Sequence, residues 1–182
     1  MPWSNTNSIG SRQFRCGHCG NQVATNLGFF SDVGGRLIYI CPHCDKPTYF
    51  ENNVPMPGVP FGNTVSHLPA EVEAVYLEAR RCTSASAFTA AVLLCRKLLM
   101  NIAVSLGAKA GEPFIFYVEY LAENGYVPPN GKGWVDHIRK KGNEATHEIV
   151  LMKQADAEEL ISFLEMLLKF IYEFPKRVPT SP

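Results

Sequence analysis

Cys16-Gly17-His18-Cys19-Gly20 and Cys41-Pro42-His43-Cys44 contain two Cys-x-x-Cys pairs, and 21 residues separate one pair from the other. Two such pairs are typical of a tetrahedral Zn²⁺ site in which each pair supplies two thiolates. Gly20 and Pro42 favour a curled backbone whose amide N–H groups point at the sulfurs. We therefore predict a structural Zn²⁺ site made by Cys16, Cys19, Cys41 and Cys44, with the insert folded as a hairpin.

The pattern from residue 13 to residue 50 is that of a zinc ribbon, a small β structure that its metal holds together. Short β-rich runs at residues 22–25, 36–40 and 48–50 alternate with the two cysteine pairs and a Gly34-Gly35 turn. Such a segment is too small to bury a core without its metal. Residues 1–10 are polar and small, and we expect them to be frayed.

The other histidines and cysteines of interest have simpler interpretations than metal binding. His18 and His43 lie between the paired thiols and could replace one of them as a ligand, but four thiolates already complete a tetrahedral set. Cys82 and Cys95 fall in a helical pattern, where a free cysteine is usually a small buried hydrophobe. Cysteines in this arrangement are typical of a reduced, cytoplasmic protein.

Composition sets limits on the class of protein. The chain has 182 residues, with 17 basic and 17 acidic side chains, so its net charge does not draw it to nucleic acid or to a membrane. We find no apolar run of membrane-spanning length and no secretory leader, and we predict no membrane partner. The length suits one medium domain and one small metal-bound domain.

Four segments follow from these patterns. We assign residues 1–50 to the zinc ribbon, 51–68 to a Pro/Gly-rich linker, 69–175 to a helical bundle and 176–182 to a flexible tail. Three prolines within residues 55–60 favour an extended connector over a helix or a central strand.

The part after Pro69 has helical periodicity throughout. We expect one helix from Pro69, a second over about residues 84–106 that stops at Gly107, and a third from Pro113 to Asn124. A fourth begins at Trp134, and a last helix opens with an Asp156-x-x-Glu159 capping box and ends at Pro175. The predicted fold class is mainly α: a small N-terminal zinc ribbon followed by an antiparallel four- or five-helix bundle.

Arg139, Asn143 and His147 lie at intervals of four residues in the predicted fourth helix, so on a continuous helix they share one face. Together they could clamp a phosphodiester, orient it and move its protons. The structural alternative is that Gly142-Asn143 ends one helix and caps the next, with the charged side chains forming local pairs. The spacing leaves both open.

This region resembles an uncharacterised bacterial domain family with an Arg-x-x-Gly-Asn-x-x-x-His signature. We place that family with the HEPN superfamily (higher eukaryotes and prokaryotes nucleotide-binding). Similarity covers roughly residues 68–174, and members often carry an N-terminal zinc ribbon. The stretches that carry the resemblance are Leu68-Pro69, Ala90-Ala91-Val92-Leu93-Leu94-Cys95-Arg96-Lys97 and Ile138-Arg139-Lys140-Lys141-Gly142-Asn143-Glu144-Ala145-Thr146-His147.

The resemblance implies a HEPN-like bundle that forms a homodimer. Active HEPN relatives are metal-independent ribonucleases of toxin and phage-defence systems, and their Arg-and-His motif meets across the dimer. Carried over, His147 would be the acid and base, Arg139 the phosphate clamp and Asn143 the orienting group. Two features depart from that pattern: Arg139 and His147 lie farther apart than in the nuclease motif, and Met100 stands where relatives commonly have Glu.

Three functions follow as hypotheses. The first is a zinc-binding, homodimerising binding and assembly protein in a nucleic-acid or antiviral defence context. The second is a metal-independent ribonuclease, and the third is a nucleotide sensor without catalysis. For the first, RNA, a nucleotide or a partner protein is the expected ligand. Aromatic side chains among the basic residues of the ribbon could stack on bases or cover a thin core, and these are Phe14, Phe29, Phe30, Tyr39 and Tyr49.

Overall fold

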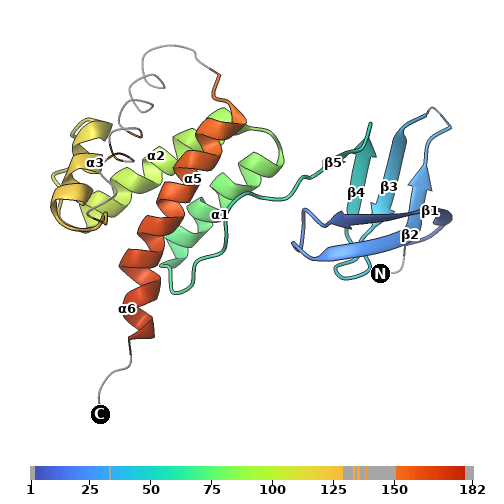
Figure 1. Ribbon diagram of the computed structural model, residues 1–182, viewed down its shortest axis with the longest axis horizontal. Coiled ribbons are helices and arrows are strands. Elements are labelled where there is room, and N and C mark those ends of the chain that lie inside the picture. Colours follow the sequence, from blue (N-terminus) through green and yellow to red (C-terminus); the bar gives the residue numbers. More distant parts are fainter. Residues whose placement is uncertain are drawn as a thin grey trace. The chain divides into compact units, whose positions relative to one another are not determined.

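The chain forms two compact units, Met1–Pro60 and Phe61–Pro182, which we call the sheet unit and the helical unit (Figure 1). The computed structural model describes residues 3–32, 34–128, 133, 135, 138 and 151–178. The segment assigned from sequence to a linker is divided between the units. Its Val54–Met56 stretch pairs into the sheet, and its residues from Phe61 onward pack on the helices.

The sheet unit is a five-stranded antiparallel sheet in which every strand pairs with the next one along the chain. Short connections of this kind suit an antiparallel meander. The strands are β1 (Asn7–Arg15), β2 (Gln22–Phe30), β3 (Arg36–Ile40), β4 (Pro47–Glu51) and β5 (Val54–Met56).

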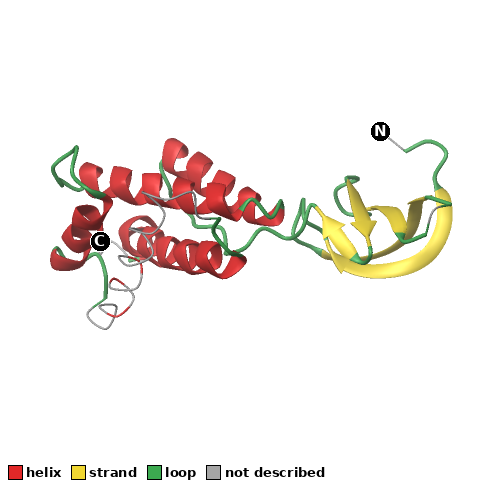
Figure 2. Cartoon of the chain, turned by 90° about the horizontal axis from the view of Figure 1, so that it is seen from above, coloured by secondary structure: helices red, strands yellow, loops and turns green. Residues whose placement is uncertain are grey.

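The sheet curls on itself and encloses a small aromatic core. Phe14 of β1 and Phe50 of β4 are not on neighbouring strands, yet their ring centroids lie 5.2 Å apart. Tyr39 of β3 packs 5.7 Å from Phe50, and its hydroxyl donates to the Gly10 carbonyl at 2.7 Å. Figure 2 shows the long first strands bending around the others. The concave side of the sheet is therefore its interior.

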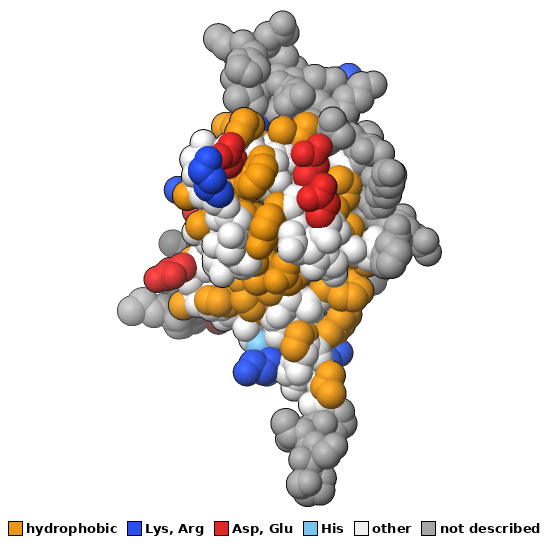
Figure 3. Space-filling view, turned by 90° about the vertical axis from the view of Figure 1, so that its left-hand side faces the viewer, with side chains coloured by type: hydrophobic (Ala, Val, Ile, Leu, Met, Phe, Trp, Pro, Cys, Tyr) orange, Lys and Arg blue, Asp and Glu red, His pale blue; other side chains and the backbone are white. Residues whose placement is uncertain are grey.

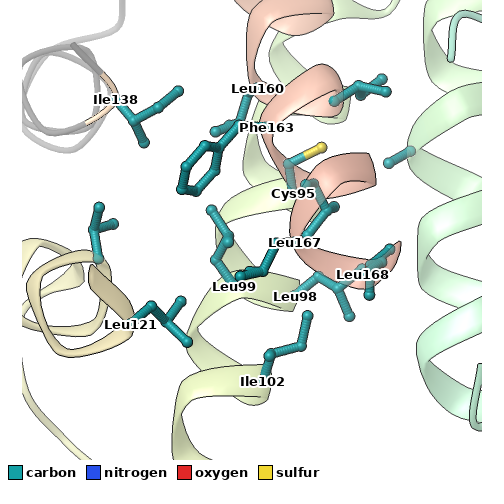
Figure 4. Packing of buried hydrophobic residues seen from close by; sticks show 14 of the residues in the cluster. Cys95, Leu98, Leu99, Ile102, Leu121, Ile138, Leu160, Phe163, Leu167 and Leu168 are labelled. Carbon is teal, nitrogen blue, oxygen red and sulfur yellow. The ribbon is translucent and has the colours of Figure 1, made fainter. Parts of the chain in front are cut away.

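The helical unit is built around α2 (Phe88–Ser105), which packs against α1 (Ala70–Ser84), α3 (Phe114–Glu123) and α5 (Gln154–Leu168). Cys95, Leu99 and Ile102 of α2 are completely buried, as are Leu164 and Leu167 of α5. Figure 4 shows these α2 side chains meeting Leu167 of α5 and Leu121 of α3. The apolar stripe of α2 thus forms the centre of the core.

Among the described helices, α2 alone has the length and apolarity of a membrane span. A central core helix passes the same test. Because its stripe of fully buried side chains packs inside the helical unit, we interpret α2 as a core helix.

The last helix runs past the proline that was expected to end it. After α5 the backbone widens into a π-helical turn, η2 (Lys169–Glu173), and continues as α6 (Phe174–Arg177). Pro175 therefore falls in the first turn of α6, directly after the π-helical turn. At the other end, the Asp156 carboxylate accepts the Lys153 N–H at 2.9 Å, so α5 begins at Gln154 and Asp156 is its third residue.

The predicted fold class is wrong in two respects. The N-terminal part is a full five-stranded sheet, because residues 7–10, which were expected to fray, form the first part of β1. The described helices do not form an antiparallel four- or five-helix bundle. α3 has only ten residues, and α2 and α5 cross rather than run side by side (Figure 1). Helical periodicity sets which face of a helix is buried but does not set how helices cross.

The segment Phe61–Ser66, which we call the strap, is held against the helices by side chains that bind its backbone. Arg80 of α1 donates to the carbonyls of Phe61 and Gly62 at 2.9 and 2.7 Å. Glu165 of α5 accepts the Asn63 backbone N–H at 2.7 Å. The buried Glu173 carboxylate accepts the Ser66 N–H at 2.8 Å. These bonds give partners to backbone N–H and carbonyl groups of the strap, which does not pair with a strand.

We expect Gly62→Ala to destabilise the helical unit more than Gly125→Ala does. Both glycines have positive φ, 78° and 79°, so each alanine has a backbone cost of about 1–2 kcal/mol. A Cβ at Gly62 would also lie 2.9 Å from Ile161 Cγ2, whereas Gly125 faces open space. Overpacking adds about 1–3 kcal/mol at Gly62 alone. Urea unfolding followed by the helical circular dichroism signal measures the difference, and equal losses would contradict it.

Acid should weaken the helical unit through Glu165. Burial raises the pKa of Glu165, but hydrogen bonds from Lys169 and Asn63 outweigh it and hold the pKa below its ordinary value of 4.5. A lowered folded pKa gives stability that is present above the ordinary pKa and is lost as the pH falls through the folded pKa. Glu165→Gln should therefore cost stability at neutral pH, and its deficit should shrink below pH 4.5. Urea midpoints measured across this range test the prediction, with the exposed Glu123→Gln as the control. A deficit that stays constant with pH would contradict it.

Candidate metal centre

The first cysteine pair lies in a tight turn between β1 and β2. The Gly20 N–H donates to the Cys16 carbonyl at 2.8 Å, and the Cys16 N–H donates to the Asn21 carbonyl at 2.9 Å. Gly20 has a φ of 75°, a left-handed conformation that glycine adopts without steric cost. The turn therefore brings the Cys16 and Cys19 side chains to the same side of the backbone.

The second pair, between β3 and β4, repeats these bonds. The Asp45 N–H donates to the Cys41 carbonyl at 2.9 Å, and the Cys41 N–H donates to the Lys46 carbonyl at 3.0 Å. Asp45, with a φ of 56°, takes the place that Gly20 has in the first turn. Sequence predicts Pro42 as the turn-forming residue, but the left-handed position of this turn belongs to Asp45. Asp tolerates the left-handed region better than most residues, which is the signal that could have identified it.

The four sulfurs come together in a geometry that fits a metal ion such as zinc. All four Sγ atoms lie within 4.8 Å of one another. The Cys16–Cys44 and Cys19–Cys41 sulfurs are each 3.8 Å apart. A tetrahedral ion with Zn–S bonds of about 2.3 Å places its ligands about 3.8 Å apart, whereas a disulfide requires about 2.05 Å. Cys16 and Cys41 are completely buried.

Electrostatics in the cluster favour a cation. Burial raises the pKa of Cys44 to about 12. At Cys19 burial also raises the pKa, but the Asn21 N–H and the neighbouring thiols outweigh it and lower the pKa to about 6. Cys19 and Cys44 therefore do not ionise over the same pH range on their own. A bound dication would stabilise all four as thiolates and displace their protons.

The histidines of the two turns are not part of the cluster. His18 Nε2 donates to the Pro47 carbonyl at 2.9 Å, and His43 is exposed. Among the described residues, the group able to hold a metal consists of the four cysteines alone. His18 contributes through its backbone instead, because its N–H donates a hydrogen bond to Cys16 Sγ at 3.4 Å.

Gly17 shows how closely the chain covers the first turn. A Cβ at this position would lie 2.3 Å from the Pro57 carbonyl oxygen and 2.4 Å from that of Gly58. Only a glycine fits, so the chain just after β5 packs directly on the first cysteine pair.

The three residues proposed for phosphodiester chemistry, Arg139, Asn143 and His147, lie outside the described residues, and their roles stay predictions. In the described part, a cavity of about 20 Å³ lies beside Arg96 of α2. The Arg96 guanidinium lies 4.4 Å from the centre of the Phe114 ring, and burial lowers its pKa. This cavity is about the size needed for a water molecule and does not by itself hold a nucleotide.

The fold and the cysteine cluster define a protein with a candidate metal-binding sheet unit joined to a helical unit. The profile of a domain of unknown function (DUF4145) matches residues 77–181, which is more than half of the chain. The chain therefore belongs to the DUF4145 family. The match begins within α1, so the four cysteines lie outside it. No curated protein and no solved structure matches the chain.

Proposed function

We propose that this protein is a zinc-stabilised binding and assembly protein. The observation that supports the proposal is the closed donor set: the four clustered cysteine sulfurs would fill every position of a tetrahedral ion. Zinc sites of this kind are structural, whereas catalytic zinc keeps one position open for water or substrate. In the proposal, zinc holds the sheet unit as a recognition module that works in a nucleic-acid or antiviral defence context.

The helical unit, in this proposal, brings two copies of the chain together. Leu93 and Val104 of α2 are 52% and 39% exposed, and they lie on one face because eleven residues make about three helical turns. Figure 3 shows hydrophobic side chains gathered in a band across the visible face of the helical unit. Exposed apolar surface of this kind supports an interface between protein chains.

Light scattering after size exclusion tests the assembly. The proposal expects the mass of a dimer, with one zinc ion for each chain. Leu93→Glu should give monomers that keep the helical circular dichroism signal of the wild type. A monomeric wild-type protein would contradict the proposed dimer. The zinc site is tested separately, by the zinc content of the purified protein.

Two alternative functions stay predictions, because they depend on residues outside the described part of the chain. A metal-independent ribonuclease should cleave RNA in EDTA, and His147→Ala should abolish the cleavage. A nucleotide sensor should be stabilised thermally by nucleotide, and Arg139→Ala should remove that stabilisation. Binding and assembly alone requires neither result.

A further inference from the structure

The convex side of the sheet carries a continuous apolar row. Phe29 of β2 lies directly opposite Ile38 of β3, which lies opposite Tyr49 of β4, which lies opposite Met56 of β5. Directly opposed residues of antiparallel strands point to the same face of the sheet. These four side chains therefore form one line across four strands, which we call the outer row.

The outer row faces away from the core of the sheet unit. The neighbouring residues Tyr39 and Phe50 point to the concave side and are only 3% and 2% exposed. By contrast, Phe29, Ile38 and Tyr49 are only partly buried, and Met56 is 48% exposed. Of the aromatic residues that sequence could not sort, Phe14 and Tyr39 point to the interior, whereas Phe29 and Tyr49 lie on the outer face.

Trp3 extends the outer row at the β2 end. Its ring packs edge-on against Phe29 with centroids 6.1 Å apart, and its Nε1 donates to the Asp45 carbonyl at 2.8 Å. The indole is still 39% exposed. Because Asp45 belongs to the second cysteine turn, the position of this ring depends on the metal centre being formed.

The charge on this face distinguishes between kinds of partner. Two residues farther along each strand, on the same face, Arg36 lies opposite Glu51, and the two form an ion pair at 3.1 Å. Val54, opposite Glu51, is 60% exposed. The two charges of this pair cancel, so the pair attracts a polyanion only weakly. Trp, Tyr, Phe and Met are instead the residue types enriched where proteins meet, and charged residues are depleted there.

We propose that the outer row, with Trp3, is the docking surface for an amphipathic helix of a partner protein, which presents an uncharged apolar stripe. The inference rests on the proposed function, because it makes the zinc-held sheet unit the recognition module. The row crosses three strand spacings of about 4.8 Å, or about 14 Å. An amphipathic helix of about ten residues presents an apolar stripe of that length.

The test uses the zinc-loaded full chain and a displayed library of amphipathic helical peptides as the probe. Peptides selected on the wild type should bind Met56→Glu and Tyr49→Ala roughly tenfold or more weakly. Phe30→Ala is the matched control, because Phe30 is 56% exposed and adjacent to Phe29 but lies opposite Leu37, on the other face. Zinc content is measured for each variant, so that loss of the fold is not taken for loss of the surface.

Three results would overturn the proposal. They are selection of no peptide, binding that is unchanged in Met56→Glu and Tyr49→Ala, and binding that is lost equally in Phe30→Ala. Single-stranded oligo(U) RNA is tested alongside; if it binds and the same two variants abolish its binding, the face belongs to nucleic acid and the protein partner is wrong. Failure of the proposed function is distinguishable from these results. In that case the purified protein contains no zinc, and the metal measurement shows this before any peptide is added.

Discussion

Cys41→Ser should unfold the sheet unit and leave the helical unit folded. The sheet unit has a small core made mainly of Phe14, Tyr39 and Phe50 with the cysteines themselves. A structural zinc ion contributes about 10–16 kcal/mol to the folding of comparable zinc-finger peptides, and such peptides are unfolded without it. The helical unit has its own, much larger core and does not require the metal.

Two-dimensional amide NMR measures this result. Amide signals of the sheet unit should collapse to unfolded positions in Cys41→Ser, and in the wild type after a chelator removes zinc at neutral pH. The helical circular dichroism signal should persist in both. Cys82→Ser is the control, because Cys82 lies in α1 and outside the metal cluster. Dispersed sheet-unit signals without metal would show that the sheet folds unaided.

Leu99→Ala should have the largest effect on the helical unit. Leu99 is completely buried at the centre of α2, where it packs against other apolar side chains of the core (Figure 4). Removing three carbon atoms from such a position leaves a cavity. We expect the free energy of unfolding to fall by about 2–5 kcal/mol. Thermal and urea unfolding followed by helical circular dichroism would measure the loss.

Leu93→Ala provides a closely matched comparison. It removes the same atoms from the same helix, but Leu93 is 52% exposed in the single chain, so protein kept dilute enough to be monomeric loses little packing. We expect a change within about 0.5 kcal/mol, as for most surface substitutions. Similar losses in the two variants would mean that the side of α2 carrying Leu99 is not the core side.

Sequence was sufficient where structure depends on local geometry. The two cysteine pairs are turns of a few residues, and their sulfurs lie together as the spacing predicts. Helix ends with a backbone signal were also close to prediction. Pro113 immediately precedes α3, and Gly107, with a φ of 106°, follows the end of α2.

Sequence was insufficient where structure depends on distant partners. β1 has a polar, small-residue sequence, and it becomes a strand because it pairs with β2 and because the Tyr39 hydroxyl binds Gly10. Likewise, the residues near Tyr39 and Tyr49 in the sequence do not indicate that Tyr39 points inward and Tyr49 outward. Strand register decides this. The outer row could therefore not be found before the pairing was known.

X-ray absorption at the zinc edge, on protein purified without added metal, tests the central claim most directly. The account predicts one zinc ion per chain, bound by four sulfur atoms at about 2.3 Å. A chain that contains no metal, a first shell with nitrogen or oxygen in place of sulfur, or cysteines joined as disulfides would contradict it.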